Sequence, residues 1–164
     1  MQEAVFNAKR QGERRMEEAV FRPIGVVRNE VIEPRRGGWE KVTSDIIVDE
    51  GLGEGLDGLE EFSHVVVVFW MHKVPVGHRP AVKIHPQGRT DLPLVGLFAT
   101  RSPYRPNPVG VSAPRLLERR GNVLTVVGLD AVDGTPVLDI KPYLPHLDAP
   151  DDYRGPDWVT RFRR

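Results

Sequence analysis

The sequence predicts a mainly β protein: a small antiparallel β-barrel with few short helices, an irregular N-terminal lead and an irregular C-terminal tail. Most of the chain alternates between short runs rich in β-branched residues and clusters of turn-forming residues, a pattern typical of short strands. Its 164 residues include 16 glycines and 15 prolines, which favours many turns over a helical bundle. Short strands in such a series fold as closed or partly closed barrels. The length is that of one ordinary domain, large enough to bury a core without disulfides.

The chain begins with a charged lead. Residues 1–19 contain "AKRQGERRMEE" and little apolar periodicity, so we expect a frayed helix or a disordered segment, with Met16 as an alternative start. They lack the apolar stretch of a signal peptide. The predicted domain therefore spans residues 20–164.

Eight segments of this domain are predicted as strands. The longest apolar run, "VVVVFWM" at 65–71, falls far short of the roughly 20 residues that span a bilayer, so no membrane association is expected. Asp133 and Gly134 lie between two of the runs and predict a hairpin turn. Aromatic side chains are expected in the core at Phe62, Phe69, Trp70 and Phe98. The eight predicted strand segments are 20–29, 44–50, 62–72, 79–85, 93–100, 109–118, 122–130 and 135–142.

The charge distribution limits the partners. Lys and Arg together number 23, as do Asp and Glu, so bulk positive charge cannot be what binds a nucleic acid. Between Arg79 and Arg120, however, eight basic residues outnumber two acidic ones. The chain has no cysteine, which excludes disulfides and thiolate metal sites and, without a signal peptide, predicts a cytoplasmic protein.

Two motifs resemble ligand sites but have the wrong context. Residues 53–58, "GEGLDG", match the G-x-G-x-x-G pattern, yet only "LEEFSH" separates them from the next buried strand, which leaves no room for the helix of a dinucleotide site. His72, His78 and His85 are not accompanied by a metal-binding motif or by a cysteine. We therefore expect neither a nucleotide-binding loop nor a metal site.

A proline-rich loop carries three polar side chains. In "ATRSPYRPNPVG", residues 99–110, three prolines fall within six positions. Proline fixes φ and has no amide proton, so this stretch is a stiff loop rather than a helix or a central strand. Such a loop can hold Arg101, Arg105 and Asn107 ready to bind a ligand. The two arginines could instead form ion pairs with neighbouring aspartates, and this alternative stays open.

Four segments, "FRPIGVVRN", "LEEFSHVVVVFWMH", "GLFATRSPYRPNPVGVS" and "GLDAVDGTPVLDIKPYLP", closely resemble a family of S-adenosylmethionine-dependent tRNA methyltransferases with a small β-barrel, the TsaA-like or TrmO-like family. The resemblance covers residues 21–148. It implies methylation of N6 of the threonylcarbamoyl-modified adenosine at tRNA position 37, with S-adenosylmethionine as cofactor and the anticodon loop as partner. It also implies a homodimer with a composite active site. We expect the compact, single-domain type, because the chain stops soon after the predicted barrel.

The resemblance further implies site residues. Carboxylates suit a cationic adenosyl cofactor, and arginines suit the anticodon phosphates. In-line methyl transfer needs positioning of the attacking nitrogen and an acceptor for its N–H group, so Asn107 and Arg105 are the predicted catalytic residues. No metal is needed for this reaction. The cofactor residues implied are Pro34, Arg35, Arg36, His72, Lys73, Arg101, Val111, Asp130, Ala131, Val132 and Asp133.

Two other functions fit the same residues. A barrel can bind RNA or an adenosine ligand without catalysis, and a methyltransferase with this cofactor can act on a small molecule instead of tRNA. Assays of the protein with S-adenosylmethionine and tRNA distinguish these functions.

Overall fold

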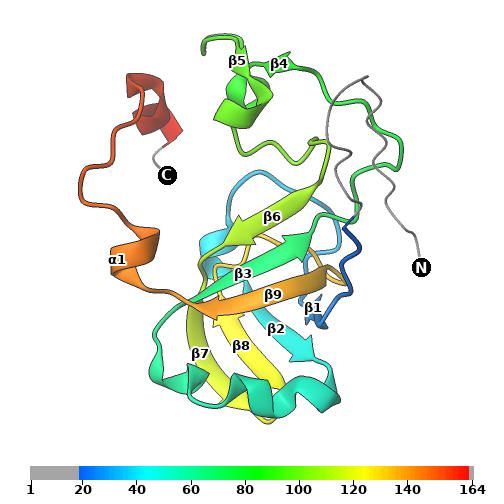
Figure 1. The fold of residues 1–164 in the computed structure, drawn as a ribbon. Coiled ribbons are helices and arrows are strands. Elements are labelled where there is room, and N and C mark those ends of the chain that lie inside the picture. The colour runs from blue at the N-terminus through cyan, green and yellow to red at the C-terminus, as the bar shows by residue number, and fades with distance from the viewer. Residues whose placement is uncertain (1–18, 163–164) are drawn as a thin grey trace, which may run out of the picture.

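A seven-stranded antiparallel sheet forms the centre of the computed structural model, which describes residues 19–162 (Figure 1). All but the last residue of the predicted N-terminal lead lies outside the described residues. The spatial order of the strands is β6-β3-β9-β1-β2-β8-β7. The bounds are β1 (Gly25–Arg28), β2 (Thr43–Val48), β3 (Val65–Trp70), β6 (Val109–Ser112), β7 (Arg115–Arg120), β8 (Val123–Val127) and β9 (Pro136–Pro142).

The strands form where the sequence alternates between buried and exposed positions. In β2, Ser44, Ile46 and Val48 are buried and the residues between them are exposed, which is the period of two that one face of a sheet requires. Val65 and Val67 of β3 are fully buried in the same way. Ile46 and Val48 of β2 join Val65 and Val67 of β3 in one apolar cluster. This cluster also contains Val27, Leu124, Val126, Leu129 and Val137. The sequence prediction of a mainly antiparallel β fold is therefore confirmed.

The two edge strands of the sheet are consecutive in the chain. Strands β6 and β7 are separated only by Ala113 and Pro114. The strand ends there because a proline has no backbone N–H to donate to a neighbouring strand. Strand β6 pairs with β3, whereas β7 pairs with β8. Near this bend Leu116 N donates to Ser63 O at 2.9 Å, and an isolated bridge joins His64 to Arg115. The strand order itself does not close, so the expected barrel is not confirmed.

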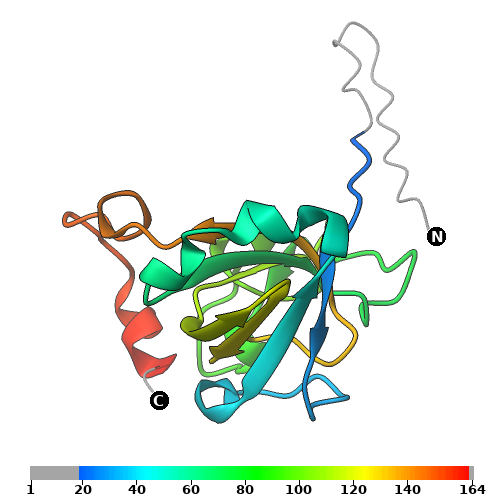
Figure 2. The ribbon, with the colours of Figure 1, turned by 90° about the horizontal axis from the view of Figure 1, so that it is seen from below.

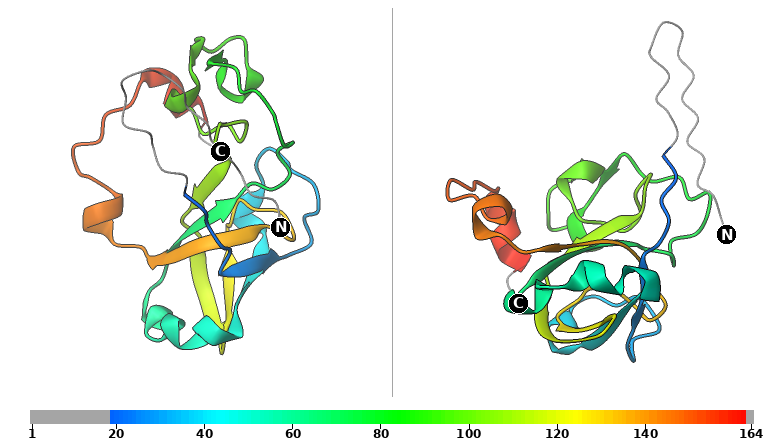
Figure 3. Two further views of the ribbon diagram at one scale, coloured as in Figure 1. Left: turned by 45° about the vertical axis from the view of Figure 1, so that its right-hand side comes forward. Right: turned by 60° about the horizontal axis from the view of Figure 1, so that its bottom comes forward.

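Two predicted strands belong to a separate small sheet. The segments 79–85 and 93–100 contribute only β4 (Lys83–Ile84) and β5 (Val95–Gly96), which pair with each other and not with the main sheet. The short 3-10 helices η4 (Pro86–Gly88) and η5 (Leu97–Ala99) accompany them. Proline and glycine at the ends of these runs shorten the strands. Figures 1 and 3 show this arm standing beyond the end of the main sheet where β6 begins.

The Asp133-Gly134 pair makes a turn but not the predicted hairpin. Thr135 N donates to Val132 O at 3.2 Å, and Gly134 has a φ of 75°, which a glycine adopts without strain. The strands on either side, β8 and β9, are not paired, because β1 and β2 lie between them in the sheet. The turn therefore carries the chain across the end of the sheet instead of linking neighbours.

The remaining helices are short, as predicted. The "GEGLDG" stretch falls in the 3-10 helix η2 (Glu50–Leu56) and the turn after it, with η3 (Leu59–Glu61) following, so no βαβ unit is present there. Viewed from below in Figure 2, η2 and η3 cross the end of the sheet opposite the β4–β5 arm. The other helices are η1 (Trp39–Lys41), α1 (Pro145–Asp148) and η6 (Asp157–Phe162). Within residues 19–162, none of the helices has the length and apolar character of a membrane span.

Candidate functional site

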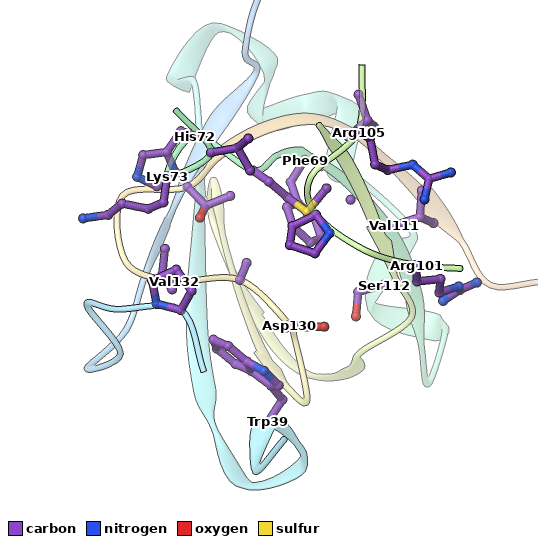
Figure 4. Close-up of a pocket in the computed structure, with 18 of the residues that line it drawn as sticks. Trp39, Phe69, His72, Lys73, Arg101, Arg105, Val111, Ser112, Asp130 and Val132 are labelled. Atoms are coloured by element: carbon purple, nitrogen blue, oxygen red, sulfur yellow. The ribbon is translucent and has the colours of Figure 1, made fainter. Parts of the chain in front are cut away.

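A pocket of about 830 Å³ lies at the end of the main sheet from which the β4–β5 arm extends. Its wall comes from segments far apart in the sequence: residues 34–39 before and within η1, the end of β3, strand β6, the turn after β8, and residues 98–105. Figure 4 shows these side chains pointing toward one space from several directions. The volume is in the range usual for small-molecule sites.

Most of the residues predicted from sequence line this pocket together. On one side, in Figure 4, lie His72, Lys73 and Val132, and on the other lie Arg101, Arg105 and Val111, with Asp130 between them. Their convergence follows from the sheet, because β3 and β6 are antiparallel neighbours, so the end of β3 lies beside the start of β6, and the turn after β8 lines the same pocket. The predicted residues that line the pocket are Pro34, Arg35, His72, Lys73, Arg101, Arg105, Val111, Asp130, Ala131 and Val132.

Three predicted residues do not line it. Asn107 is exposed, and its carbonyl oxygen accepts a hydrogen bond from Val109 N at 2.8 Å within the proline-rich loop. Arg36 is exposed on the loop beside η1. The carboxylate of Asp133 turns toward β1, where it accepts from Asn29 N at 3.2 Å and lies 3.4 Å from the guanidinium of Arg28. Asp133 thereby holds the turn after β8 against the end of β1.

The floor of the pocket contains aromatic residues that the sequence did not mark as site residues. Phe69 is 4% exposed, and its ring lies against the backbone of Gly110, where an added Cβ would be 2.4 Å from the ring. Trp39 is 7% exposed and donates from its indole nitrogen to Arg35 O at 3.3 Å. The guanidinium of Arg35 covers the Trp39 ring at 5.1 Å. The one sequence signal for the close approach of the Phe69 ring to the backbone is Gly110, a glycine inside a predicted strand.

His72 is held in an uncharged state. Burial lowers the pKa of His72 below its ordinary value of 6.5, the neighbouring charge of Lys73 lowers it further, and Asp133 opposes both. Its Nδ1 is buried and has no hydrogen-bond partner within residues 19–162. Buried polar atoms without partners are rare, and those that persist are commonly found at functional sites. His72 therefore contributes a neutral imidazole to the pocket at pH 7.

The two loop arginines do not pair with aspartates in the part of the chain that the structure describes. Arg105 donates from Nη1 to Thr100 O at 2.8 Å, and its guanidinium lies 5.5 Å from the ring of Phe98. Arg101 is exposed and forms neither an ion pair nor a hydrogen bond with another of the described residues. Within residues 19–162 the ion-pair alternative is thus wrong for both, and Arg101 presents to the pocket a charge that none of these residues pairs.

The histidines that raised the metal question lie in different surroundings. His78 packs on Tyr104 with ring centroids 4.9 Å apart, and His85 Nδ1 lies 2.8 Å from Leu92 O. Within residues 19–162 the structure holds no group of three or more His, Cys, Asp or Glu side chains placed to bind a metal ion.

Sequence and structure comparisons place the pocket in a known domain. Residues 27–149 match the family model of the tRNA-methyltransferase O N-terminal domain. The chain belongs to this family. Every residue that lines the pocket lies inside the matched range of the tRNA-methyltransferase O domain.

Relatives of the chain carry names that refer to one cofactor and one reaction. It is 37% identical over 140 residues to the S-adenosyl-L-methionine-binding protein of Archaeoglobus fulgidus, covering 83% of this chain and 97% of that protein. It is 45% identical over 98 residues to the tRNA (adenine(37)-N6)-methyltransferase of Mus musculus, covering 59% of this chain but 22% of that protein. The crystal structure of TrmO from Pseudomonas aeruginosa superposes with a TM-score of 0.69 at 33% identity, covering 89% of this chain and 64% of that one. The chain thus spans less than two thirds of the TrmO structure.

Proposed function

We propose that this protein transfers a methyl group from S-adenosylmethionine to N6 of adenosine 37 in tRNA. One observation carries the proposal: most of the residues that the family resemblance implies line a single pocket, and the described residues of that pocket all lie within the matched tRNA-methyltransferase O domain. The names of the Archaeoglobus and mouse relatives support the cofactor and the reaction.

The pocket fits the cofactor in size and in charge. A volume of about 830 Å³ is enough for a nucleoside joined to an amino acid. Asp130 supplies a carboxylate and Arg101 a cation that no described residue neutralises, so oppositely charged ends of a zwitterionic ligand each have a partner. Phe69 and Trp39, which both line the pocket, offer apolar area for a planar base.

Each polar residue has a definite task in this proposal. When bound, the cofactor supplies an electrophilic methyl group, so the protein chiefly positions the attacking nitrogen in line with it. Asp130 to Val132 hold the adenosyl portion, and Asp133 acts on the cofactor by fixing this turn to Asn29. Arg101 and Lys73 bind anionic groups at the pocket mouth. The side-chain oxygen of Asn107 accepts a hydrogen bond from the attacking N6 amino group and so orients its lone pair toward the methyl group, while two flanking prolines keep this rim rigid. For this contact the substrate must extend over the rim, because Asn107 lies beyond the pocket wall.

A homodimer with a composite site, in the cytoplasm, completes the proposal. Strand β6 is an edge of the sheet, and its outward residues Val109 and Val111 are 39% and 51% exposed beside the pocket. Exposed edge strands with apolar side chains are surfaces on which a second chain can dock. A second copy docked here would add a wall to the pocket at Val111. We further propose that the preferred adenosine carries a threonylcarbamoyl group, as the resemblance implies.

Nucleoside analysis tests the function directly. The protein is incubated with S-adenosylmethionine and with tRNA that does or does not carry the threonylcarbamoyl group, and the digested nucleosides are separated and weighed by mass spectrometry. We expect a gain of one methyl group on adenosine 37, formed much more slowly by the Arg101→Ala variant. Binding of S-adenosylmethionine and tRNA without methyl transfer would indicate a binding protein. Methyl transfer to small molecules alone would indicate a different methyltransferase.

A further inference from the structure

Phe98 occupies an unexpected place for a phenylalanine. It was predicted in the core, but it is 76% exposed and lines the pocket, so it lies at the rim. The preceding residue, Leu97, takes the buried position at 4% exposure. Leu97 N donates to Val82 O at 2.9 Å, and Thr100 Oγ1 donates to Leu97 O at 2.7 Å. These bonds fix the 3-10 turn η5, so the ring of Phe98 is presented to solvent by an anchored element.

The exposed ring is backed by a cation. The guanidinium of Arg105 lies 5.5 Å from the Phe98 ring centroid and is itself held by the hydrogen bond to Thr100 O. A guanidinium over one face of a ring is a favourable cation–π contact. Beside it Tyr104 is 50% exposed and packs on His78. The rim therefore carries two exposed aromatic rings next to the positive charges of Arg101 and Arg105.

We propose that the Phe98 ring, backed by Arg105, stacks an unpaired base of the RNA substrate and so positions the RNA over the pocket. This inference rests on the proposed function and names a positioning residue for its RNA. Proteins recognise single-stranded RNA loops by stacking splayed bases on exposed aromatic rings, with nearby arginines binding the phosphates. Charge favours this occupant: among the described residues the pocket is lined by the cations Arg35, Arg101 and Arg105, by Lys73, which lies 3.8 Å from Glu33, and by one carboxylate, Asp130.

Binding of an anticodon stem-loop RNA tests the inference. The RNA carries one fluorescent base, 2-aminopurine, placed at each unpaired loop position in turn. Stacking on an aromatic ring quenches the fluorescence of this base. Phe98→Leu keeps apolar bulk without a ring, and Phe98→Tyr keeps the ring. Phe62→Leu is the matched control, since Phe62 is 37% exposed and does not line the pocket. Calorimetry of S-adenosylmethionine and light scattering are run on every variant.

We expect Phe98→Leu to bind the RNA about 5- to 150-fold more weakly, which is the usual loss for one stacked base. The loss should appear in KM rather than in kcat, with unchanged cofactor binding. At one loop position, binding to the wild type should quench the 2-aminopurine fluorescence. Phe98→Leu should abolish this quenching, whereas Phe98→Tyr and Phe62→Leu should keep it. Equal RNA binding by wild type and Phe98→Leu would overturn the inference while leaving the function intact. A dimer that dissociates in Phe98→Leu would overturn it in favour of a subunit interface. No RNA binding by the wild type would overturn the proposed function, and the inference with it.

Discussion

Gly110→Ala should damage the fold and the pocket together. An added Cβ at this position would lie 2.4 Å from two atoms of the Phe69 ring, whereas ordinary contact begins at 3.4 Å, so the ring must retreat by about 1 Å. Phe69 is 4% exposed and packed in the main core, which leaves it little room. Overpacking of this kind typically costs about 1–3 kcal/mol. For a chain of this length the melting temperature should fall by roughly 2–12 °C. S-adenosylmethionine should also bind more weakly, because the same ring forms the pocket floor.

Gly96→Ala is the matched control. Gly96 has an extended backbone with a φ of −60°, and nothing lies within 4 Å of an added Cβ. Thermal and urea unfolding, with calorimetry of the cofactor, are measured on both variants and on Gly110→Ala with Phe69→Leu. The smaller leucine should relieve the clash, so the double variant should lose less stability than the sum of the single changes. If Gly110→Ala unfolds within about 0.5 kcal/mol of Gly96→Ala, the packing argument is wrong.

Four further outcomes are expected. The pKa of His72 is lowered in the folded state, so on acidification the unfolded chain takes up this proton at a higher pH than the folded chain does. The free energy of unfolding should therefore fall as the pH drops below about 6.5. Urea unfolding of His72→Gln should show a weaker pH dependence than the wild type. Arg101→Ala should lower kcat/KM for tRNA about 10- to 150-fold, because one charge-assisted contact to the substrate is lost. The melting curve should not change, because no described residue loses a hydrogen-bond or ion-pair partner. Asp133→Ala should cost about 0.5–1.5 kcal/mol in urea unfolding and also weaken cofactor binding, because the Asn29 amide loses its acceptor; unchanged calorimetric binding would contradict its place in the site. Asn107→Ala should slow single-turnover methylation roughly a hundredfold with an unchanged melting curve, and near-normal rates would remove its catalytic assignment.

Local structure and most of the pocket residues can be predicted from the order of amino acids. The alternation in β2 and β3 is visible in the letters, because a strand sends successive side chains to opposite faces whatever its neighbours are. The stiffness of the loop around Asn107 follows from proline chemistry alone. The motifs also led to most of the pocket residues, although through resemblance to a family and not through periodicity.

How these segments come together depends on contacts between residues that are far apart in the chain. Strands β8 and β9 flank a turn that suits a hairpin, yet β1 and β2 separate them, since pairing is chosen by core packing over the whole sheet. The Asp133 carboxylate is satisfied by Asn29, more than a hundred residues away, and no local pattern shows such a partner. Phe98 and Leu97 are equally apolar in sequence, but one turn can bury only one of them, and the bonds to Val82 and Thr100 selected Leu97. Local periodicity encodes which residues can be buried, whereas long-range contacts determine which of them are.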